Sequence, residues 1–266
     1  MKAQMETHAV GQLTIEPRDQ VTVLRIDRPE KLNALTAAFW TDVQTVLHRL
    51  EHDGRTRVIV LTGAGDKAFC AGGDIGDFAK LATLAQKRSF QADAMRGFAA
   101  LENCPLPVIA AVNGLALGGG CELTLACDIV IASDHAQFGM PEAALGLVPG
   151  YGVLRAPDVI GRQLTKLMVM AGERLTAQQA LTAGLVQSVV PHATLLDSAH
   201  ALAERIAANS SLAHRIGKQL INRSIDRAQF DHSVEALTVL QSSDDAREGI
   251  AAFLEKRRPR FSPPAS

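Results

Sequence analysis

Two glutamates in this sequence stand in the first turns of expected helices, among apolar neighbours. Glu122 follows the run Gly118-Gly119-Gly120, and Glu142 follows Pro141, a residue favoured at the first position of a helix. A carboxylate at a helix start can be a structural cap, stabilised by the helix dipole. In an apolar pocket, desolvation would instead raise its pKa toward the range useful for proton transfer. Taken one at a time, the two interpretations are evenly balanced.

The two glutamates lie 20 residues apart and bracket one expected strand, so they could converge on one cleft. Paired carboxylates suit addition to a double bond because one takes a proton from water while the other delivers a proton to carbon. The glycine run would leave free N–H donors at a helix start, where negative charge is favoured. The segment Ala71-Gly72-Gly73-Asp74-Ile75 offers a second set of donors. Alone, that segment reads more simply as a glycine loop with Asp74 capping a helix.

Short strands and helices alternate along the chain and must position these residues. Strands are expected at 12–16, 21–26, 58–61, 108–112, 128–132 and 186–190. Helices are expected at 36–52 with Thr36 as the cap, at 90–102, at 121–127, and after the capping box Thr176-x-x-Gln179. More helices are expected near 193–208, 210–225, 230–241 and 244–254. This order predicts an α/β core with parallel strands over residues 1–190 and a helical C-terminal region over 191–266.

Composition and charge argue against several classes of protein. Hydrophobic residues are 47% and charged residues 21% of the 266 residues, as in a globular protein with a large core. The net charge of −1 argues against a nucleic-acid partner. We expect no signal peptide and no membrane partner, because no long apolar segment is present. The four cysteines lack C-x-x-C spacing and the eight histidines lack H-E-x-x-H, which predicts reduced thiols, a cytoplasmic location and no metal site.

The segment Gly63-Ala-Gly65-x-x-Ala68 follows a strand and matches the dinucleotide fingerprint G-x-G-x-x-A. Two features speak against a dinucleotide site. The residues after Ala68 do not open a helix, and no acidic residue ends a second strand about 20 residues further on. We therefore do not expect a dinucleotide site at this segment.

The segments taken together resemble the enoyl-CoA hydratase/isomerase (crotonase) superfamily. The resemblance runs through five ordered motifs, which are Arg-Pro-Glu-Lys-Leu-Asn-Ala-Leu at 28–35 and the segments 68–75, 116–122, 138–150 and 248–257. It implies a spiral of ββα units with a helical C-terminal region that forms homotrimers, often paired into a dimer of trimers. It also implies an acyl-CoA substrate and no cofactor beyond the CoA of that substrate.

The resemblance further implies a role for each site residue. The N–H groups of Gly73 and Gly119 would form an oxyanion hole for the thioester carbonyl. Glu122 would activate water for attack at C3, and Glu142 would protonate C2. The water and acyl site would be shaped by a loop that departs from the usual pattern and is one residue shorter, with Gly150, Tyr151 and Gly152. CoA contacts are expected from Lys31, Ala71, Gly73, Asp74, Ile75, Phe253 and Lys256.

Several functions remain open at this point. Reversible syn hydration of a trans-2-enoyl-CoA is favoured because both glutamates are present. Isomerisation between Δ3- and Δ2-enoyl-CoA needs only a carboxylate near Glu142. Other family reactions are thioester hydrolysis and lyase chemistry, and a remoter alternative is a non-catalytic CoA-binding protein. The basic tail Lys256-Arg257-Arg258-Pro259-Arg260 could serve CoA or be a solvated surface.

Overall fold

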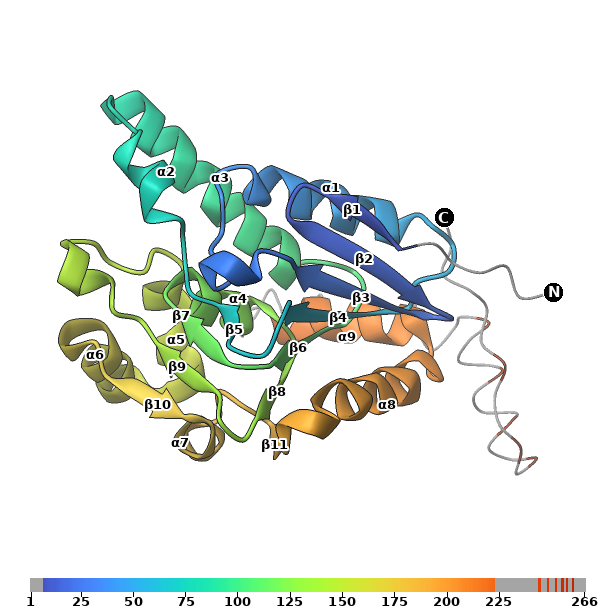
Figure 1. Cartoon of the computed structure of the whole chain (residues 1–266). Helices are drawn as coiled ribbons and strands as arrows, with labels where there is room; N and C mark the ends of the chain where they lie inside the picture. Colours follow the sequence, from blue (N-terminus) through green and yellow to red (C-terminus); the bar gives the residue numbers. More distant parts are fainter. Residues whose placement is uncertain are drawn as a thin grey trace, which may run out of the picture.

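The computed structural model describes residues 7–222 and the single residues 244, 248, 252, 255, 257 and 260. Its centre is a seven-stranded sheet in the order β1-β2-β3-β4-β6-β8-β11 (Figure 1). The first three strands pair antiparallel, and every pairing from β3 to β11 is parallel. This confirms the predicted α/β fold with parallel strands. The bounds are β1 His8–Val10, β2 Leu13–Arg18, β3 Val21–Ile26, β4 Val58–Gly63, β6 Val108–Val112, β8 Ile129–Ser133 and β11 Ser188–Val190.

A second sheet of four strands, in the order β10-β9-β7-β5, stands beside the first. Its members are β5 (Ala68–Cys70), β7 (Leu115–Leu117), β9 (Gln137–Gly139) and β10 (Arg174–Thr176). Strands β4, β6 and β8 of the large sheet are each followed by one strand of the small sheet and then by a helix. These are the repeated ββα units. The small-sheet strands are three residues long, too short to show alternation in the sequence.

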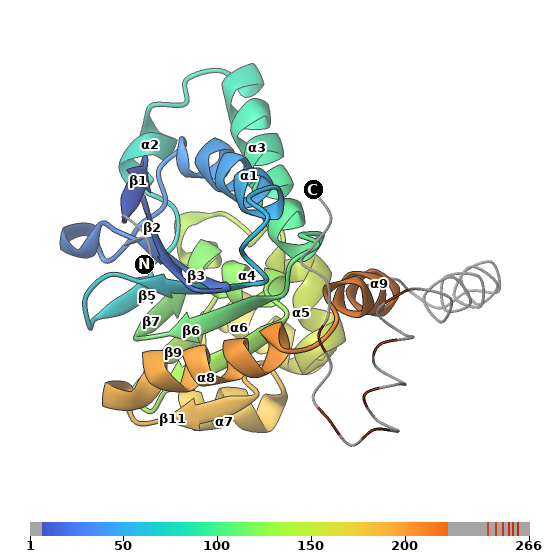
Figure 2. The same ribbon diagram turned by 90° about the vertical axis from the view of Figure 1, so that its right-hand side faces the viewer.

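Helices cover both faces of the large sheet. Alternate strand residues face opposite ways, so each strand contributes to two apolar clusters. One cluster joins Leu24, Leu61 and Val112 to α1 (Phe39–Glu51) and α3 (Leu84–Glu102). The other joins Val23, Val60 and Ala111 to the alanine face of α8 (Leu195–Ala207). Figures 1 and 2 show α1 and α3 on one side of the sheet and α8 on the other.

Shorter helices connect these layers, and no helix of the described residues is long and apolar enough to cross a membrane. The capping box at Thr176 and Gln179 is confirmed at the start of α7. The remaining α-helices are α2 (Ile75–Ala79), α4 (Gly119–Ala126), α5 (Gly152–Ile160), α6 (Arg162–Ala171), α7 (Ala177–Ala183) and α9 (Ser211–Ile221). The 3-10 helices are η1 (Pro29–Lys31), η2 (Glu142–Leu145) and η3 (His192–Thr194).

Two predicted helix starts were wrong. Helix α1 begins at Phe39 without a side-chain cap, because the Thr36 hydroxyl instead donates to Gln12 Oε1 at 2.8 Å. Helix α3 begins at Leu84 rather than at residue 90, because Thr83 and Gln86 form a capping box there. The helices expected at 230–241 and 244–254 lie outside the described residues, apart from positions 244, 248 and 252.

Candidate active site

Helix α4 carries Glu122 in its first turn and begins at a turn that favours glycine. Gly118, just before the helix, has φ 52° and ψ −124°, where other residues are strained. A Cβ atom at Gly120 would lie 2.0 Å from the Cys70 carbonyl oxygen. Glycine at this position therefore allows α4 to pack directly on the end of β5.

The amides of Gly73 and Gly119 lie close together at this contact. A Cβ atom on Gly119 would be 3.8 Å from the Gly73 nitrogen. Gly73 forms a parallel bridge with Leu35 through the carbonyl before it and the amide after it, each in a 2.8 Å hydrogen bond. The N–H of Gly73 itself therefore points to the other side. Gly119 is the first residue of α4, so its N–H has no acceptor within the helix. Within the described part of the chain, neither N–H donates to a protein acceptor.

Glu122 is buried and held by the start of another helix. Its Oε1 accepts the backbone N–H groups of Tyr151 and Gly152, both at 2.8 Å. These amides belong to the first turn of α5, where the helix dipole favours a negative charge. Burial raises the pKa of Glu122, and the two N–H donors oppose that rise because they stabilise the ionised form. Both bonds engage Oε1, which leaves Oε2 to accept a proton from water.

Glu142 meets the same cleft from the first position of η2, after Pro141. A Cβ atom at Gly118 would lie 2.8 Å from Glu142 Oε1, so this carboxyl sits beside the start of α4. Its Oε2 is buried without a hydrogen-bond partner among the described residues. Burial raises the pKa of Glu142 to about 7, with a smaller contribution from the charge of Glu122 and against the opposing effect of a hydrogen bond with the Glu142 backbone. Near neutral pH this side chain can therefore both hold and release a proton.

The two carboxyl groups thus have different environments. Glu122 has two charge-stabilising donors, whereas the buried oxygen of Glu142 has none. Two carboxyl groups in different environments can differ in how readily each is ionised. The roles predicted from the family resemblance, with Glu122 as the base and Glu142 as the acid, remain predictions.

An apolar cleft surrounds the carboxyl groups and the two amides. Its walls come mostly from α1, α2 and α3 and from the segment after η2, and aromatic rings are prominent although aromatics are only 4% of the chain. Sequence reasoning missed these walls. The spacing Phe90, Ala94 and Phe98 places three of them on one face of α3, a signal present in the sequence. The other large apolar lining residues are Trp40, Phe78, Met95, Leu145, Leu147 and Val148.

The residues predicted to bind CoA are only partly near this cleft. Ala71, Gly73 and Ile75 line it. Asp74 caps α2 by accepting the Gly76 N–H at 2.9 Å, as predicted, and its carboxylate also accepts Arg28 at 3.1 Å. The Arg28 hydrogen bond is the largest cause of the lowered pKa of Asp74. Lys31 is exposed at the end of η1 and does not line the cleft, and Phe253 and Lys256 lie outside the described residues.

The segment predicted as an acyl-site loop is the start of a helix. Gly150 and Tyr151 line the cleft, and Gly152 is the first residue of α5 rather than part of a loop. A Cβ atom at Gly152 would lie 2.7 Å from Met140 Sδ and 3.4 Å from Glu122 Cγ. Glycine therefore permits the close approach between α5 and the glutamate.

The structure gives the dinucleotide-like glycines a structural role. The chain continues from Ala68 into β5, so no helix starts there. The Asn113 side chain donates to the carbonyls of Gly63 at 3.1 Å and Gly65 at 2.7 Å. A Cβ atom at Gly63 would lie 2.4 Å from the Ala68 carbonyl oxygen.

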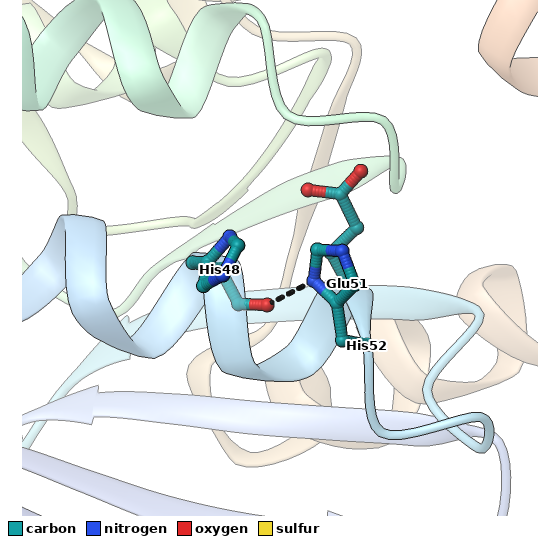
Figure 3. A group of neighbouring side chains, drawn as sticks. All are labelled: His48, Glu51 and His52. Carbon is teal, nitrogen blue, oxygen red and sulfur yellow. Dashed lines mark hydrogen bonds between the residues drawn. The ribbon is translucent and has the colours of Figure 1, made fainter. Parts of the chain in front are cut away.

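A separate group that sequence motifs did not reveal lies at the far end of α1. Ligand-capable atoms of His48, Glu51 and His52 come within 4.8 Å of one another, and the His52 Nδ1 is 2.8 Å from the His48 carbonyl oxygen (Figure 3). These residues are 8 to 12 positions after Trp40, or about 12–18 Å along the helix. The group is therefore distinct from the cleft.

Comparison with known proteins gives a consistent result. Residues 16–264 match the model of the enoyl-CoA hydratase/isomerase family. The chain is 38% identical to a short-chain-enoyl-CoA hydratase of Clostridium acetobutylicum, over 94% of this chain and 97% of the relative. It is also 38% identical to a 2,3-dehydroadipyl-CoA hydratase of Escherichia coli, over 95% and 99%. Its fold matches the crystal structure of an enoyl-CoA hydratase from Bacillus anthracis with a TM-score of 0.90, at 36% identity over 95% and 99% of the chains.

Proposed function

Because the chain belongs to the enoyl-CoA hydratase/isomerase family, we propose that it is an enoyl-CoA hydratase that adds water reversibly to a trans-2-enoyl-CoA. The observation that carries this proposal is the convergence of Glu122 and Glu142, in different environments, on a cleft with two unused backbone amides. Hydration needs a base, an acid and a site for the negative charge that develops on the thioester oxygen, and the cleft offers all three.

The thioester carbonyl would bind between the N–H groups of Gly73 and Gly119. These donors are fixed by the bridge to Leu35 and by the first turn of α4, so they need no reorganisation as charge builds on the oxygen. One such donor typically contributes about 2.7–4 kcal/mol to transition-state stabilisation. The resulting enolate is the intermediate, and its protonation gives the hydrated product.

The two carboxyl groups divide the proton transfers. Glu122, held through Oε1 by α5, takes a proton from water as the water oxygen bonds to C3. Glu142 gives its proton to C2, and its pKa of about 7 keeps much of it protonated at neutral pH. The active site returns to its starting state when one proton moves from Glu122 to Glu142 through water.

The acyl group of the substrate is proposed to be uncharged. Among the described residues that line the cleft, the acidic side chains Glu122 and Glu142 carry the ionisable charges and no cation is present. A terminal carboxylate would be buried beside like charge without a partner, which is strongly unfavourable. Alkenoyl substrates should therefore be preferred over the 2,3-dehydroadipyl group named for the Escherichia coli relative.

Other parts of the proposal rest on the family resemblance. CoA would bind near Ala71, Ile75 and Lys31, with Phe253 and Lys256 joining from the C-terminal region. The reaction would use no cofactor, so dialysis against a chelator should not change the rate. Homotrimers or dimers of trimers would form. Exposed apolar side chains such as Val148, Leu154 and Met170, with 58–73% exposure, support such an assembly. The four cysteines, all free thiols, are consistent with a cytoplasmic location.

The test is hydration of crotonyl-CoA, followed by loss of the conjugated enoyl absorbance. Glu122→Gln should lower kcat by roughly 10²–10⁴-fold with little change in KM, because glutamine can still accept the α5 amides but cannot take a proton. The matched control is Glu204→Gln, which changes an exposed glutamate on α8 and should leave both constants unchanged.

Two results would contradict the proposal. Absence of hydration by the parent protein across a range of acyl chain lengths would rule out the hydratase function. If the parent instead isomerised 3-enoyl-CoA, and Glu122→Gln kept that activity, an isomerase using Glu142 alone would be the better description.

A further inference from the structure

Two helix ends are fastened to each other behind the cleft. Phe98 and Glu102 lie one turn apart at the end of α3, and Tyr151 and Arg155 lie one turn apart at the start of α5. The Tyr151 ring stacks on Phe98, with centroids 4.9 Å apart and planes 22° from parallel. The Tyr151 hydroxyl donates to Glu102 Oε2 at 2.7 Å. Tyr151 is only 3% exposed, so the hydroxyl makes this bond in a buried setting.

Arg155 completes the fastening. Its Nη2 donates to Glu102 Oε2 at 2.9 Å, its Nε lies 2.8 Å from Glu102 Oε1 as part of the ion pair, and its Cζ lies 5.8 Å from the centroid of the Tyr151 ring. A charge-assisted hydrogen bond of this kind is stronger than a neutral one. The backbone carbonyl of Glu102 also accepts the Asn222 amide at 2.8 Å, so the end of α3 is itself held in place. We call these three side chains, Tyr151, Glu102 and Arg155, the α3–α5 clamp.

The clamp acts at the point where α5 meets the candidate base. The backbone N–H of Tyr151 and that of Gly152 are the two donors to Glu122 Oε1. The same residue, Tyr151, thus holds Glu122 with its backbone and the end of α3 with its side chain. A shift of the first turn of α5 would lengthen both donor bonds together.

We infer that the α3–α5 clamp positions the base, so that Tyr151 and Glu102 are positioning residues that act on Glu122 through the first turn of α5. This inference rests on the proposed hydratase function for its kinetic consequence, and on the geometry alone for its structural one. Sequence patterns did not reveal it, because Glu102 and Tyr151 are 49 residues apart.

The expected consequence has a definite sign. The two N–H donors lower the pKa of Glu122 against the rise caused by burial. If the clamp is loosened, the donors move away, the ionised form loses stabilisation, and the pKa of Glu122 rises further. The acidic limb of the pH profile of kcat, which requires ionised Glu122, then moves to higher pH. KM for the thioester should change little, because Gly73 and Gly119 are not part of the clamp.

The experiment compares Tyr151→Phe and Glu102→Gln, singly and together, with the parent protein. Tyr151→Phe keeps the ring that stacks on Phe98 and removes only the hydroxyl. The matched control is Glu16→Gln, which breaks the Glu16–Arg25 pair, also at 2.8 Å but on β2 and β3. Each protein is assayed with crotonyl-CoA from pH 5 to 9, and its thermal melt confirms that it is folded.

A second measurement is independent of catalysis. Hydrogen exchange of the peptide that covers residues 150–155 reports whether the Tyr151 and Gly152 amides are still bonded. We expect roughly tenfold faster exchange in both clamp variants. The control should exchange at the rate of the parent protein. We also expect a kcat lowered about three- to tenfold, an acidic limb at higher pH, and a double variant that is no worse than the sum of the single variants.

The outcomes separate the two proposals. If the parent hydrates crotonyl-CoA but Tyr151→Phe changes neither the exchange nor the acidic limb, the clamp inference is refuted. If the parent hydrates no enoyl-CoA and the exchange still rises in both variants, the proposed function falls while the clamp stands. A fall in kcat with an unmoved pH profile would also overturn the inference, because a merely structural loss would act in that way.

Discussion

Glu142 should destabilise the folded protein at neutral pH, and Glu142→Gln should remove that cost. Burial raises the pKa of this carboxyl from 4.5 to about 7. A raised pKa in an acid means that the folded state binds the proton more tightly than the unfolded chain does. The contribution of this group to stability is therefore fully present below pH 4.5 and is lost as the pH rises through 7, where the folded state must hold a charge in the apolar cleft.

The size of the effect follows from the shift. Taken in full, a rise from 4.5 to about 7 corresponds to about 3 kcal/mol at pH 7. Because the side chain is only partly buried, water screens part of this, and we expect about half of that value. For a chain of this length, about 1.5 kcal/mol corresponds to a rise in Tm of roughly 3–6 °C. Glutamine keeps the volume and loses the charge.

Thermal melts of the parent protein and Glu142→Gln between pH 4.5 and 8 provide the assay. The variant should melt at a higher temperature at pH 8, and the difference should vanish near pH 4.5. Glu204→Gln, the exposed control, should follow the parent throughout. A constant difference across this range, or a less stable variant at pH 8, would show that the pKa of Glu142 is not raised. The same variant should hydrate crotonyl-CoA much more slowly, since it cannot protonate C2.

Three further predictions concern a glycine contact, an ion pair and the four thiols. Gly120→Ala should abolish hydration and destabilise the fold, because its Cβ would meet the Cys70 carbonyl at 2.0 Å; this is checked by kcat and a thermal melt. Lys218→Met should cost about 1 kcal/mol in urea unfolding, because it removes the half-buried ammonium that lies 2.8 Å from the exposed Asp128 carboxylate. The four cysteines should react slowly with a thiol reagent at pH 8 until the protein unfolds, because burial raises the pKa of each thiol; fast labelling of the native protein would contradict this.

Local patterns were enough to predict much of this structure. The β-branched run at 21–26 predicts a strand and the glycines before Glu122 predict a helix start, and neither prediction depends on the rest of the chain. Glu122 and Glu142 could be selected because both stand in first turns among apolar residues. Their roles came from the family resemblance and remain predictions, and the two Tyr151 and Gly152 N–H donors to Glu122 could not be foreseen from the sequence.

Contacts between distant segments were beyond sequence reasoning. The small sheet is built from three-residue strands that pair with one another although they lie far apart in the sequence. The start of α5 was predicted as a loop, because Pro157 and two glycines weaken the helical pattern of this segment. This helix start matters to the site only because it contacts Glu122, which lies on another helix. The cleft walls likewise combine Trp40 of α1 with Phe78 of α2 and Phe98 of α3, a combination that the fold alone creates.

In the proposed mechanism, backbone N–H groups bind the thioester oxygen, whereas two side chains carry out proton transfer. A point mutation can replace either glutamate without moving the Gly73 and Gly119 amides, which are set by the Leu35 bridge and by the start of α4. Descendants of this chain could therefore exchange or relocate the acid and the base, and so acquire a different reaction, while inheriting an intact grip on the activated carbonyl. The carboxylates of the site can therefore change in evolution while the backbone amides are kept.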